Sequence, residues 1–259
     1  MPYTPRRIPQ LIAHRGDTGA APDNSVAAIR AAAALGVDMI EFDICASADG
    51  APVVVHGPRL ERWSTGTGRV VDQDVAQLVT HRLRDRNGEV VHAETIPTLA
   101  EALDAAGATA VNCDIKDPAI VDAVVAELLD RSMGDRAVLS GLTPRQARRT
   151  QRRHGDRMAV LVNLDRLDAV VGRWRRARTG WLLRRHGRLF RHGIVGLNVP
   201  HRWVDAALVR GVHRLGGTIW VFTVDDQARV DELVAMGVDS ITTNRPGDIV
   251  VPAGPSASS

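Results

Sequence analysis

The sequence is poor in cysteine and in long apolar runs, and both shortages narrow the choice of protein class. Only two cysteines occur among 259 residues, Cys45 and Cys113, and both lie in apolar, strand-like runs. A disulfide framework is therefore not suggested, and we expect two small buried thiols. No apolar run reaches the roughly 18 residues of a membrane span. The apolar stretch at residues 11–13 is too short for a secretory signal. Together these absences predict a cytoplasmic protein.

Lysine is almost absent. Of the 33 lysines and arginines, only Lys116 is a lysine, although the net charge is +3 and the isoelectric point is about 9.5. The two side chains differ in shape, hydration and pKa, so they are not interchangeable. A chain that uses arginine nearly everywhere has kept a compact ammonium at one position. Lys116 is therefore a candidate functional residue, with chance as the alternative.

Short apolar runs alternate with helical patterns along the chain. Each run is almost entirely apolar until its last residues, which is typical of parallel strands buried on both faces. Eight strands separated by helices predict the α/β class and a single (β/α)8 TIM barrel. A doubly wound open sheet is the competing fold, but no glycine-rich dinucleotide loop follows the first strand. The expected strands are residues 11–16, 39–46, 110–116, 137–142, 158–163, 194–199, 218–224 and 240–244.

Helix-capping residues support these boundaries. Ser25 precedes an alanine-rich run, and Thr98 with Glu101 resembles a capping box. Between the second strand and the next helix, residues 53–92 predict a short extended connection that is too small for a domain of its own. We expect one domain over residues 1–251 and a disordered tail over 252–259. The expected helices are residues 24–35, 98–106, 119–131, 144–154, 166–176, 203–215 and 226–236.

Acidic side chains stand on two of the expected strands. Because strand side chains alternate, Glu41 and Asp43 share one face, about 7 Å apart at the backbone. Buried like charges this close are costly without a cation or protons. By themselves the two acids fit either a metal site or a partly solvated strand end with arginine partners.

A third acid changes the balance between these alternatives. Asp114 and Lys116 share a face at the end of another strand, and the carboxyl ends of barrel strands form active sites. Three converging carboxylates predict a divalent metal, and oxygen ligands favour Mg²⁺ or Ca²⁺ over zinc. Lys116 would then face an anion bound to that metal.

Two histidines follow apolar runs, His14 after the first strand and His56 after residues 53–55. Arg15 comes directly after His14. A titratable imidazole beside a guanidinium suits phosphate chemistry, and two histidines in one barrel mouth could serve as general base and general acid. The alternative for each histidine is an ordinary core or loop residue.

The motifs, taken in order, resemble those of glycerophosphodiester phosphodiesterases. The resemblance spans residues 11–248, and the ordered set is far more specific than any single piece. The motifs are HRG at 14–16, PDNS at 22–25, IEFD at 40–43, DG at 49–50, VVVH at 53–56, STGTG at 64–68, IPTLAEAL at 96–103, DIK at 114–116, FTVDD at 222–226 and MGVDSITTNRP at 236–246.

This resemblance implies a metal-dependent barrel enzyme that hydrolyses glycerophosphodiesters to an alcohol and glycerol 3-phosphate. It implies Mg²⁺ or Ca²⁺ as the cofactor, with Mn²⁺ as a further candidate. The implied roles are metal ligands at Glu41, Asp43 and Asp114, an acid–base pair at His14 and His56, and phosphate contacts at Arg15 and Lys116.

Three positions depart from the family pattern. Gly57 stands where an aspartate usually follows the histidine, so the comparison with the family predicts a changed orientation of His56. Asp114 replaces the usual glutamate, as in the related sphingomyelinase D-like phospholipases. Phe222 occupies the place of a common tryptophan, with Trp220 two residues earlier on the same face. Either aromatic side chain is a candidate wall for the glycerol side of the pocket.

Residues 166–193 combine many arginines with tryptophan, leucine and phenylalanine. A barrel helix followed by a short extra helix explains the stretch. A basic amphipathic surface that meets anionic lipid is the alternative. Nucleic-acid binding is not expected, because no recognised nucleic-acid module accompanies the stretch.

Two further functions compete with hydrolysis of small glycerophosphodiesters. A phospholipase D-like enzyme would act on lysophospholipids and would use the basic stretch to dock lipid. A catalytically weak barrel would bind phosphodiesters or a partner without turnover. Gly57 is the only feature that motivates the last alternative.

Overall fold

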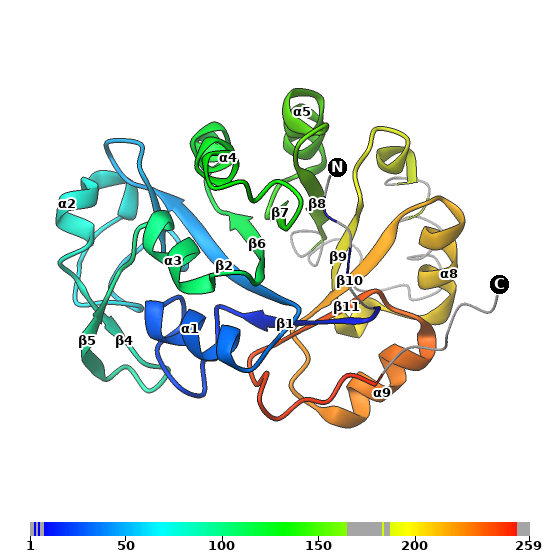
Figure 1. Cartoon of the computed structure of the whole chain (residues 1–259), viewed down its shortest axis with the longest axis horizontal. Helices are drawn as coiled ribbons and strands as arrows, with labels where there is room; N and C mark the ends of the chain where they lie inside the picture. Colours follow the sequence, from blue (N-terminus) through cyan, green and yellow to red (C-terminus); the bar gives the residue numbers. More distant parts are fainter. Residues whose placement is uncertain (1–2, 4, 6–7, 165–182, 184–186, 253–259) are drawn as a thin grey trace.

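The structure is a computed structural model that describes residues 3, 5, 8–164, 183 and 187–252. Eight parallel strands follow one another around a closed barrel, because β1 pairs with both β2 and β11 (Figure 1). All eight expected strands and the predicted TIM barrel are confirmed. The strands are β1 (Gln10–His14), β2 (Met39–Ala46), β6 (Ala110–Ile115), β7 (Ala137–Ser140), β8 (Ala159–Asn163), β9 (Gly196–Pro200), β10 (Thr218–Phe222) and β11 (Ser240–Thr243).

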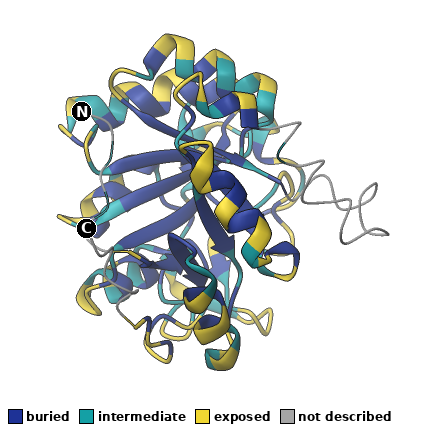
Figure 2. Cartoon of the chain, turned by 90° about the vertical axis from the view of Figure 1, so that its right-hand side faces the viewer, coloured by how far each residue is buried: buried dark blue, intermediate teal, exposed yellow. Residues whose placement is uncertain are grey.

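Helices follow the strands and cover the outside of the barrel (Figures 1 and 2). Ser25 caps α1 by accepting the amide of Ala28, and Thr98 with Glu101 forms the expected capping box of α3. The helix expected at 166–176 lies outside the described residues. The barrel helices are α1 (Val26–Ala34), α3 (Leu99–Ala106), α4 (Val121–Asp130), α5 (Pro144–His154), α8 (Ala206–Arg214) and α9 (Gln227–Met236), with short 3-10 turns at Pro118–Ile120 and His201–Trp203.

The connection between β2 and α3 has more regular structure than its sequence indicated. A strand β3 (Pro52–Val54) pairs antiparallel with β2, and β4 (Arg82–Arg84) and β5 (Val90–Thr95) form a separate hairpin. A 3-10 turn (Val70–Asp72) and α2 (Val75–Leu78) complete this insertion. It folds because it buries apolar side chains of its own against Cys45 at the end of β2: Val53, Val55, Leu60, Val70, Leu78, Leu83 and Ile96.

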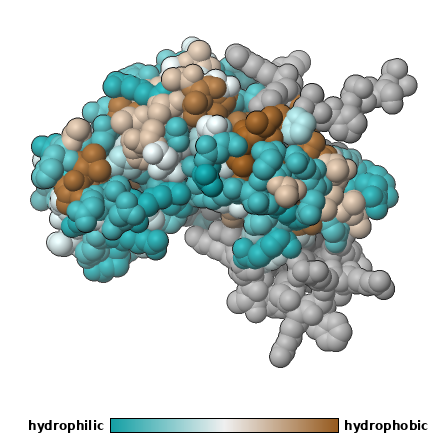
Figure 3. Space-filling model, turned by 90° about the horizontal axis from the view of Figure 1, so that it is seen from below, coloured by the Kyte–Doolittle hydropathy of each residue, from teal (hydrophilic) through white to brown (hydrophobic). Residues whose placement is uncertain are grey.

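Apolar side chains fill the barrel on both sides of its wall, and the barrel strands are buried along most of their length (Figure 2). Both cysteines are free and buried, as expected. Burial raises the pKa of Cys45 to about 12. On the face seen in Figure 3 hydrophilic residues predominate, and apolar residues form separate patches. Within the described part of the chain, no helix is both long and apolar enough to cross a membrane.

Phe42 tests how far the barrel wall depends on packing behind the acids. Its side chain is fully buried on β2 between Glu41 and Asp43. Phe42→Ala removes the ring from the main hydrophobic core and leaves a cavity. We therefore expect the free energy of unfolding, measured in urea, to fall by about 3–5 kcal/mol. Val250→Ala shortens an exposed side chain and should change it by less than about 0.5 kcal/mol. If both variants lowered the free energy of unfolding equally, Phe42 would not be a core residue.

Candidate active site

The three expected acids meet at the mouth of the barrel. Asp43 on β2 lies opposite Asp114 on β6 in the parallel register, and Glu41 lies two residues earlier on the same face of β2. One carboxylate oxygen from each residue lies within 4.8 Å of the others. Glu41 and Asp43 are almost completely buried. This spacing suits the 2.0–2.6 Å metal–oxygen distances of Mg²⁺ and Ca²⁺.

Two cations contact these acids. The guanidinium Nε of Arg15 lies 2.9 Å from Asp43 Oδ2, and Lys116 Nζ lies 2.6 Å from Asp43 Oδ1 and 2.8 Å from Asp114 Oδ2. Burial would raise the pKa of Asp43, but Lys116 and Arg15 hold it well below its usual value. Burial, together with Asp43 and Asp114, instead raises the pKa of Glu41 well above its usual value. Three carboxylates thus face two cations, and Glu41 is the acid whose negative charge is least compensated.

Asn244 fixes the proton position on His14. The Asn244 Nδ2 donates to Asp225 at 2.6 Å, so its Oδ1 faces His14 Nδ1 at 2.7 Å and accepts from it. The proton of neutral His14 is therefore on Nδ1, and Nε2 points toward Glu41 at 3.8 Å. Burial and the charge of Arg15 lower the pKa of His14 to about 4. Neutral His14 thus presents an unprotonated nitrogen to the site.

His56 is oriented without an acid at position 57. Its Nδ1 lies 2.9 Å from Asp43 Oδ2, and its ring meets Trp63 edge-on at 4.8 Å between centroids. The Nε2 atom lies 3.5 Å from a guanidinium nitrogen of Arg15. Gly57 adopts φ +82°, a conformation that favours glycine. Asp43 and Trp63 therefore orient the His56 ring, although no aspartate stands at position 57.

Asn24 is a site residue to which the sequence analysis gave no role, although it lies in the PDNS motif at 22–25. Its Nδ2 donates to Asp43 Oδ2 at 2.9 Å, while its Oδ1 accepts the Asp43 amide at 3.1 Å. The backbone of Asn24 is left-handed, with φ 65°. Asparagine tolerates this region better than most residues, which is the only sequence signal that could have indicated the role.

The two aromatic candidates lie at different depths. Trp220 is buried inside the barrel, donates from Nε1 to Thr218 at 3.0 Å and meets Tyr3 edge-on. In the strand register it lies level with Ser240 of β11, well before the carboxyl ends of the strands. The structure therefore does not bring Trp220 to the acids. Phe222 is half-buried at the last position of β10, on the same face.

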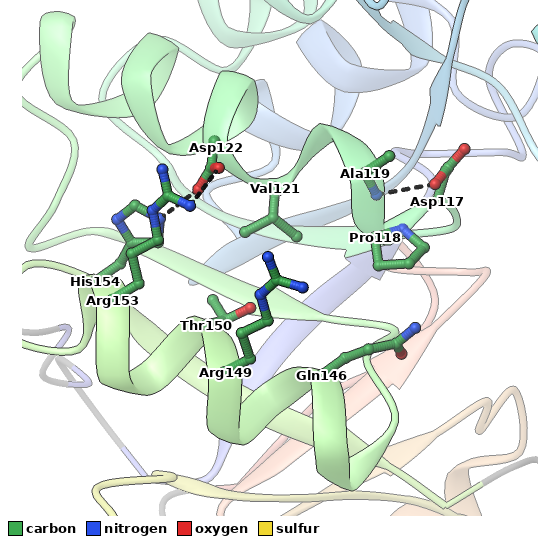
Figure 4. A pocket seen from close by; sticks show the side chains of 10 residues that line it. All are labelled: Asp117, Pro118, Ala119, Val121, Asp122, Gln146, Arg149, Thr150, Arg153 and His154. Atoms are coloured by element: carbon green, nitrogen blue, oxygen red, sulfur yellow. Dashed lines mark hydrogen bonds and ion pairs between the residues drawn. The ribbon is translucent and has the colours of Figure 1, made fainter.

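A hollow outside the barrel is not the site. It lies between the start of α4 and α5, has a volume of about 410 Å³, and is lined by Asp122, Arg149 and His154 among others (Figure 4). None of the nine expected site residues lines it. Asp122 already pairs there with His154 at 2.8 Å and with Arg153 at 3.0 Å.

The chain forms a parallel barrel with acids, histidines and cations at the carboxyl ends of its strands. This arrangement is typical of α/β-barrel enzymes. The sequence profile described as "Glycerophosphoryl diester phosphodiesterase family" matches residues 14–248. The chain therefore belongs to the glycerophosphoryl diester phosphodiesterase family. It is a phosphodiesterase that hydrolyses glycerophosphodiesters.

Known relatives agree with this placement. A glycerophosphodiester phosphodiesterase of Caldanaerobacter subterraneus is 26% identical over 93% of this chain and 96% of its own length. A Mycobacterium tuberculosis protein described as "Probable glycerophosphodiester phosphodiesterase 2" is 30% identical over 90% of this chain and 86% of its own. One similar solved structure is that of an Oleispira antarctica phosphodiesterase in complex with the product sn-glycerol-3-phosphate. It matches with a TM-score of 0.77 and 25% sequence identity, over 93% of this chain and 95% of its own.

Gly141 tests whether the position of Asp114 matters to the acid group. A Cβ at Gly141 would lie 2.0 Å from Asp114 Oδ1 and 2.5 Å from the Ile115 carbonyl oxygen, so Gly141→Ala must displace that carboxylate together with the end of β6 that carries it. We expect at least about a tenfold loss of Mn²⁺ affinity in calorimetric titration, as is typical when a ligand's support is lost.

Gly36→Ala is the matched control. Gly36 has a similar positive φ of 73°, but an added Cβ there meets nothing within 4 Å. Both variants carry the backbone strain of about 1–2 kcal/mol, so only Gly141→Ala should lose metal affinity. Equal Mn²⁺ binding by the two variants would rule out a constraint on Asp114.

Proposed function

We propose that this site hydrolyses glycerophosphodiesters to glycerol 3-phosphate and an alcohol with a divalent metal held by Glu41, Asp43 and Asp114. The observation that carries the proposal is the group of three carboxylates with oxygens within 4.8 Å of one another. Their excess negative charge over Arg15 and Lys116, and the raised pKa of Glu41, suit a bound cation.

The donor set and the charge balance favour a hard ion. Carboxylate oxygens alone suit Mg²⁺ or Ca²⁺, with Mn²⁺ as a further candidate. A divalent ion would turn the excess of one negative charge into an excess of one positive charge, which matches the single negative charge of a phosphodiester. When bound, such an ion would polarise the phosphoryl oxygens and lower the pKa of a hydroxyl group.

Arg15 and Lys116 serve as the phosphate contacts in this proposal. Both lie beside the acid group and already contact Asp43. The planar guanidinium can bind two phosphoryl oxygens at once, while the ammonium acts as a point charge. Donors fixed in this way stabilise the negative charge that grows on the phosphoryl oxygens in the transition state.

His14 and His56 move the protons. One imidazole Nε2 takes the proton of the attacking hydroxyl as its oxygen bonds to phosphorus. The other, protonated, donates to the leaving oxygen as the bond between phosphorus and the alcohol breaks. Two nucleophiles fit this pair, a water molecule and the neighbouring glycerol hydroxyl, and the second gives a cyclic phosphate first.

The product complex of the Oleispira antarctica enzyme supports a small glycerol-containing substrate. Phe222 is the aromatic residue that we propose as a wall of the glycerol side, because it lies at the end of its strand. Action on lysophospholipids is the second reaction to test. Its supporting surface at 166–193 lies mostly outside the described residues, at 165–182 and 184–186.

The experiment incubates metal-stripped protein with glycerophosphocholine, glycerophosphoethanolamine and a lysophospholipid, adding back Mg²⁺, Mn²⁺ or Ca²⁺. Products are followed by phosphorus NMR. We expect glycerol 3-phosphate to form only with metal and to disappear in His14→Ala and Asp114→Ala, with kcat reduced at least about 100-fold because a proton-transfer group or a metal ligand is lost.

Asp130→Ala is the control, since Asp130 is an exposed acid at the end of α4; it should retain full activity. Lysophosphatidic acid or a cyclic phosphate as the main product would replace the proposed reaction with the phospholipase D-like one. Binding of substrate without turnover under any metal would contradict hydrolysis.

A further inference from the structure

The tip of the β4–β5 hairpin reaches from the insertion to the barrel mouth. The turn at 85–89 is held by the Asp85 carboxylate, which accepts the amides of Asn87 at 2.9 Å and Glu89 at 2.8 Å. Arg86 stands inside this turn and extends toward two residues of the barrel. Its Nε lies 2.8 Å from Asp23 Oδ1, and one terminal nitrogen lies 2.8 Å from Asn244 Oδ1.

Through Asp23, Arg86 acts on the phosphate contact Arg15. The side chain of Asp23 is only 6% exposed and lies between two guanidinium groups. Arg15 donates to Asp23 Oδ2 at 3.0 Å and also lies against Asp43 at 2.9 Å. Without Arg86, the buried charge of Asp23 would have to be balanced by Arg15 alone, which would draw Arg15 away from the acid group.

Through Asn244, Arg86 acts on His14. Asn244 Oδ1 accepts from both Arg86 and His14 Nδ1, while Asn244 Nδ2 faces the carboxylate of Asp225. A flipped amide would place its NH₂ group against the guanidinium, which is unfavourable. Arg86 and Asp225 therefore hold the amide in the orientation that keeps the His14 proton on Nδ1 and leaves Nε2 toward the site.

The ordinary explanation for a half-exposed arginine is a surface ion pair of little consequence. Two observations oppose it here. The carboxylate that Arg86 pairs with is buried, and its second partner is the amide that directly contacts His14. Both partners of Arg86 are one contact away from a residue of the proposed mechanism.

We propose that Arg86 is a positioning residue: one guanidinium that locks Arg15 through Asp23 and His14 through Asn244, so that the insertion completes the active site. This inference rests on the proposed roles of Arg15 and His14. Arg86 itself need not touch the substrate. Its loss should therefore lower kcat more than it changes KM.

The test compares Arg86→Ala and Arg86→Lys with wild type in the metal-loaded glycerophosphodiester assay. We expect Arg86→Ala to lower kcat by about 10- to 100-fold, the usual effect of losing a residue that orients the reacting groups, with KM changed by less than about threefold. Arg86→Lys should recover little, because an ammonium cannot span Asp23 and Asn244 as a planar fork does. Millimolar guanidinium ion should restore part of the kcat of Arg86→Ala, whereas a purely structural defect would not respond.

Arg82→Ala is the matched control on the same hairpin. Arg82 is exposed, and its guanidinium bonds only to the backbone carbonyl of His92 among the described contacts. Its kcat should stay within about twofold of wild type. If Arg86→Ala matches Arg82→Ala, or if Arg86→Lys is fully active, the inference is wrong. An inactive wild-type enzyme would instead contradict the proposed function, so the two failures are distinguishable.

Discussion

The repulsion between three closely spaced carboxylates, two of them buried, is the constraint on which the rest of this structure depends. Glu41, Asp43 and Asp114 are held within 4.8 Å of one another in a site from which water is largely removed. Such a group is tolerated only when cations or protons offset it. Arg15 and Lys116 offset most of the charge, and the remaining negative charge is the one that the proposed metal ion would balance.

Local backbone features keep this costly group in place. Left-handed conformations at Arg15 and Asn24 turn the chain after β1, so that the Arg15 amide donates to Glu41 at 3.1 Å and Asn24 bonds Asp43. The absence of a side chain at Gly141 leaves room for the Asp114 carboxylate. Parts of the chain far from β2 thus converge on its acids, and the insertion adds Arg86 from outside the barrel.

Much of this arrangement could be predicted from the sequence. The apolar runs indicated all eight barrel strands, and period-two alternation put Glu41 and Asp43 on one face. Parallel strands end at one edge, which brought Asp114 and Lys116 to the same place. His56 was singled out because it follows a short apolar run, and the family resemblance then implied that it pairs with His14 in acid–base catalysis.

Other features depend on contacts that no local pattern records. Residues 53–92 have irregular polar stretches, so the buried cluster around Leu60 and Leu78 was not apparent. Asn24, Asn244 and Arg86 act through partners 19 to 230 positions away in the chain. Trp220 and Phe222 share a face by alternation, but strand register decides which of them lies near the mouth.

The most direct test of the account is the position of the metal. Crystals grown with Mn²⁺ would be measured at a wavelength where manganese scatters anomalously. The account predicts one strong anomalous peak per chain, within about 2.0–2.6 Å of oxygens from Glu41, Asp43 and Asp114. A peak elsewhere in the described barrel, or Lys116 still bridging Asp43 and Asp114 with no peak between the acids, would contradict it.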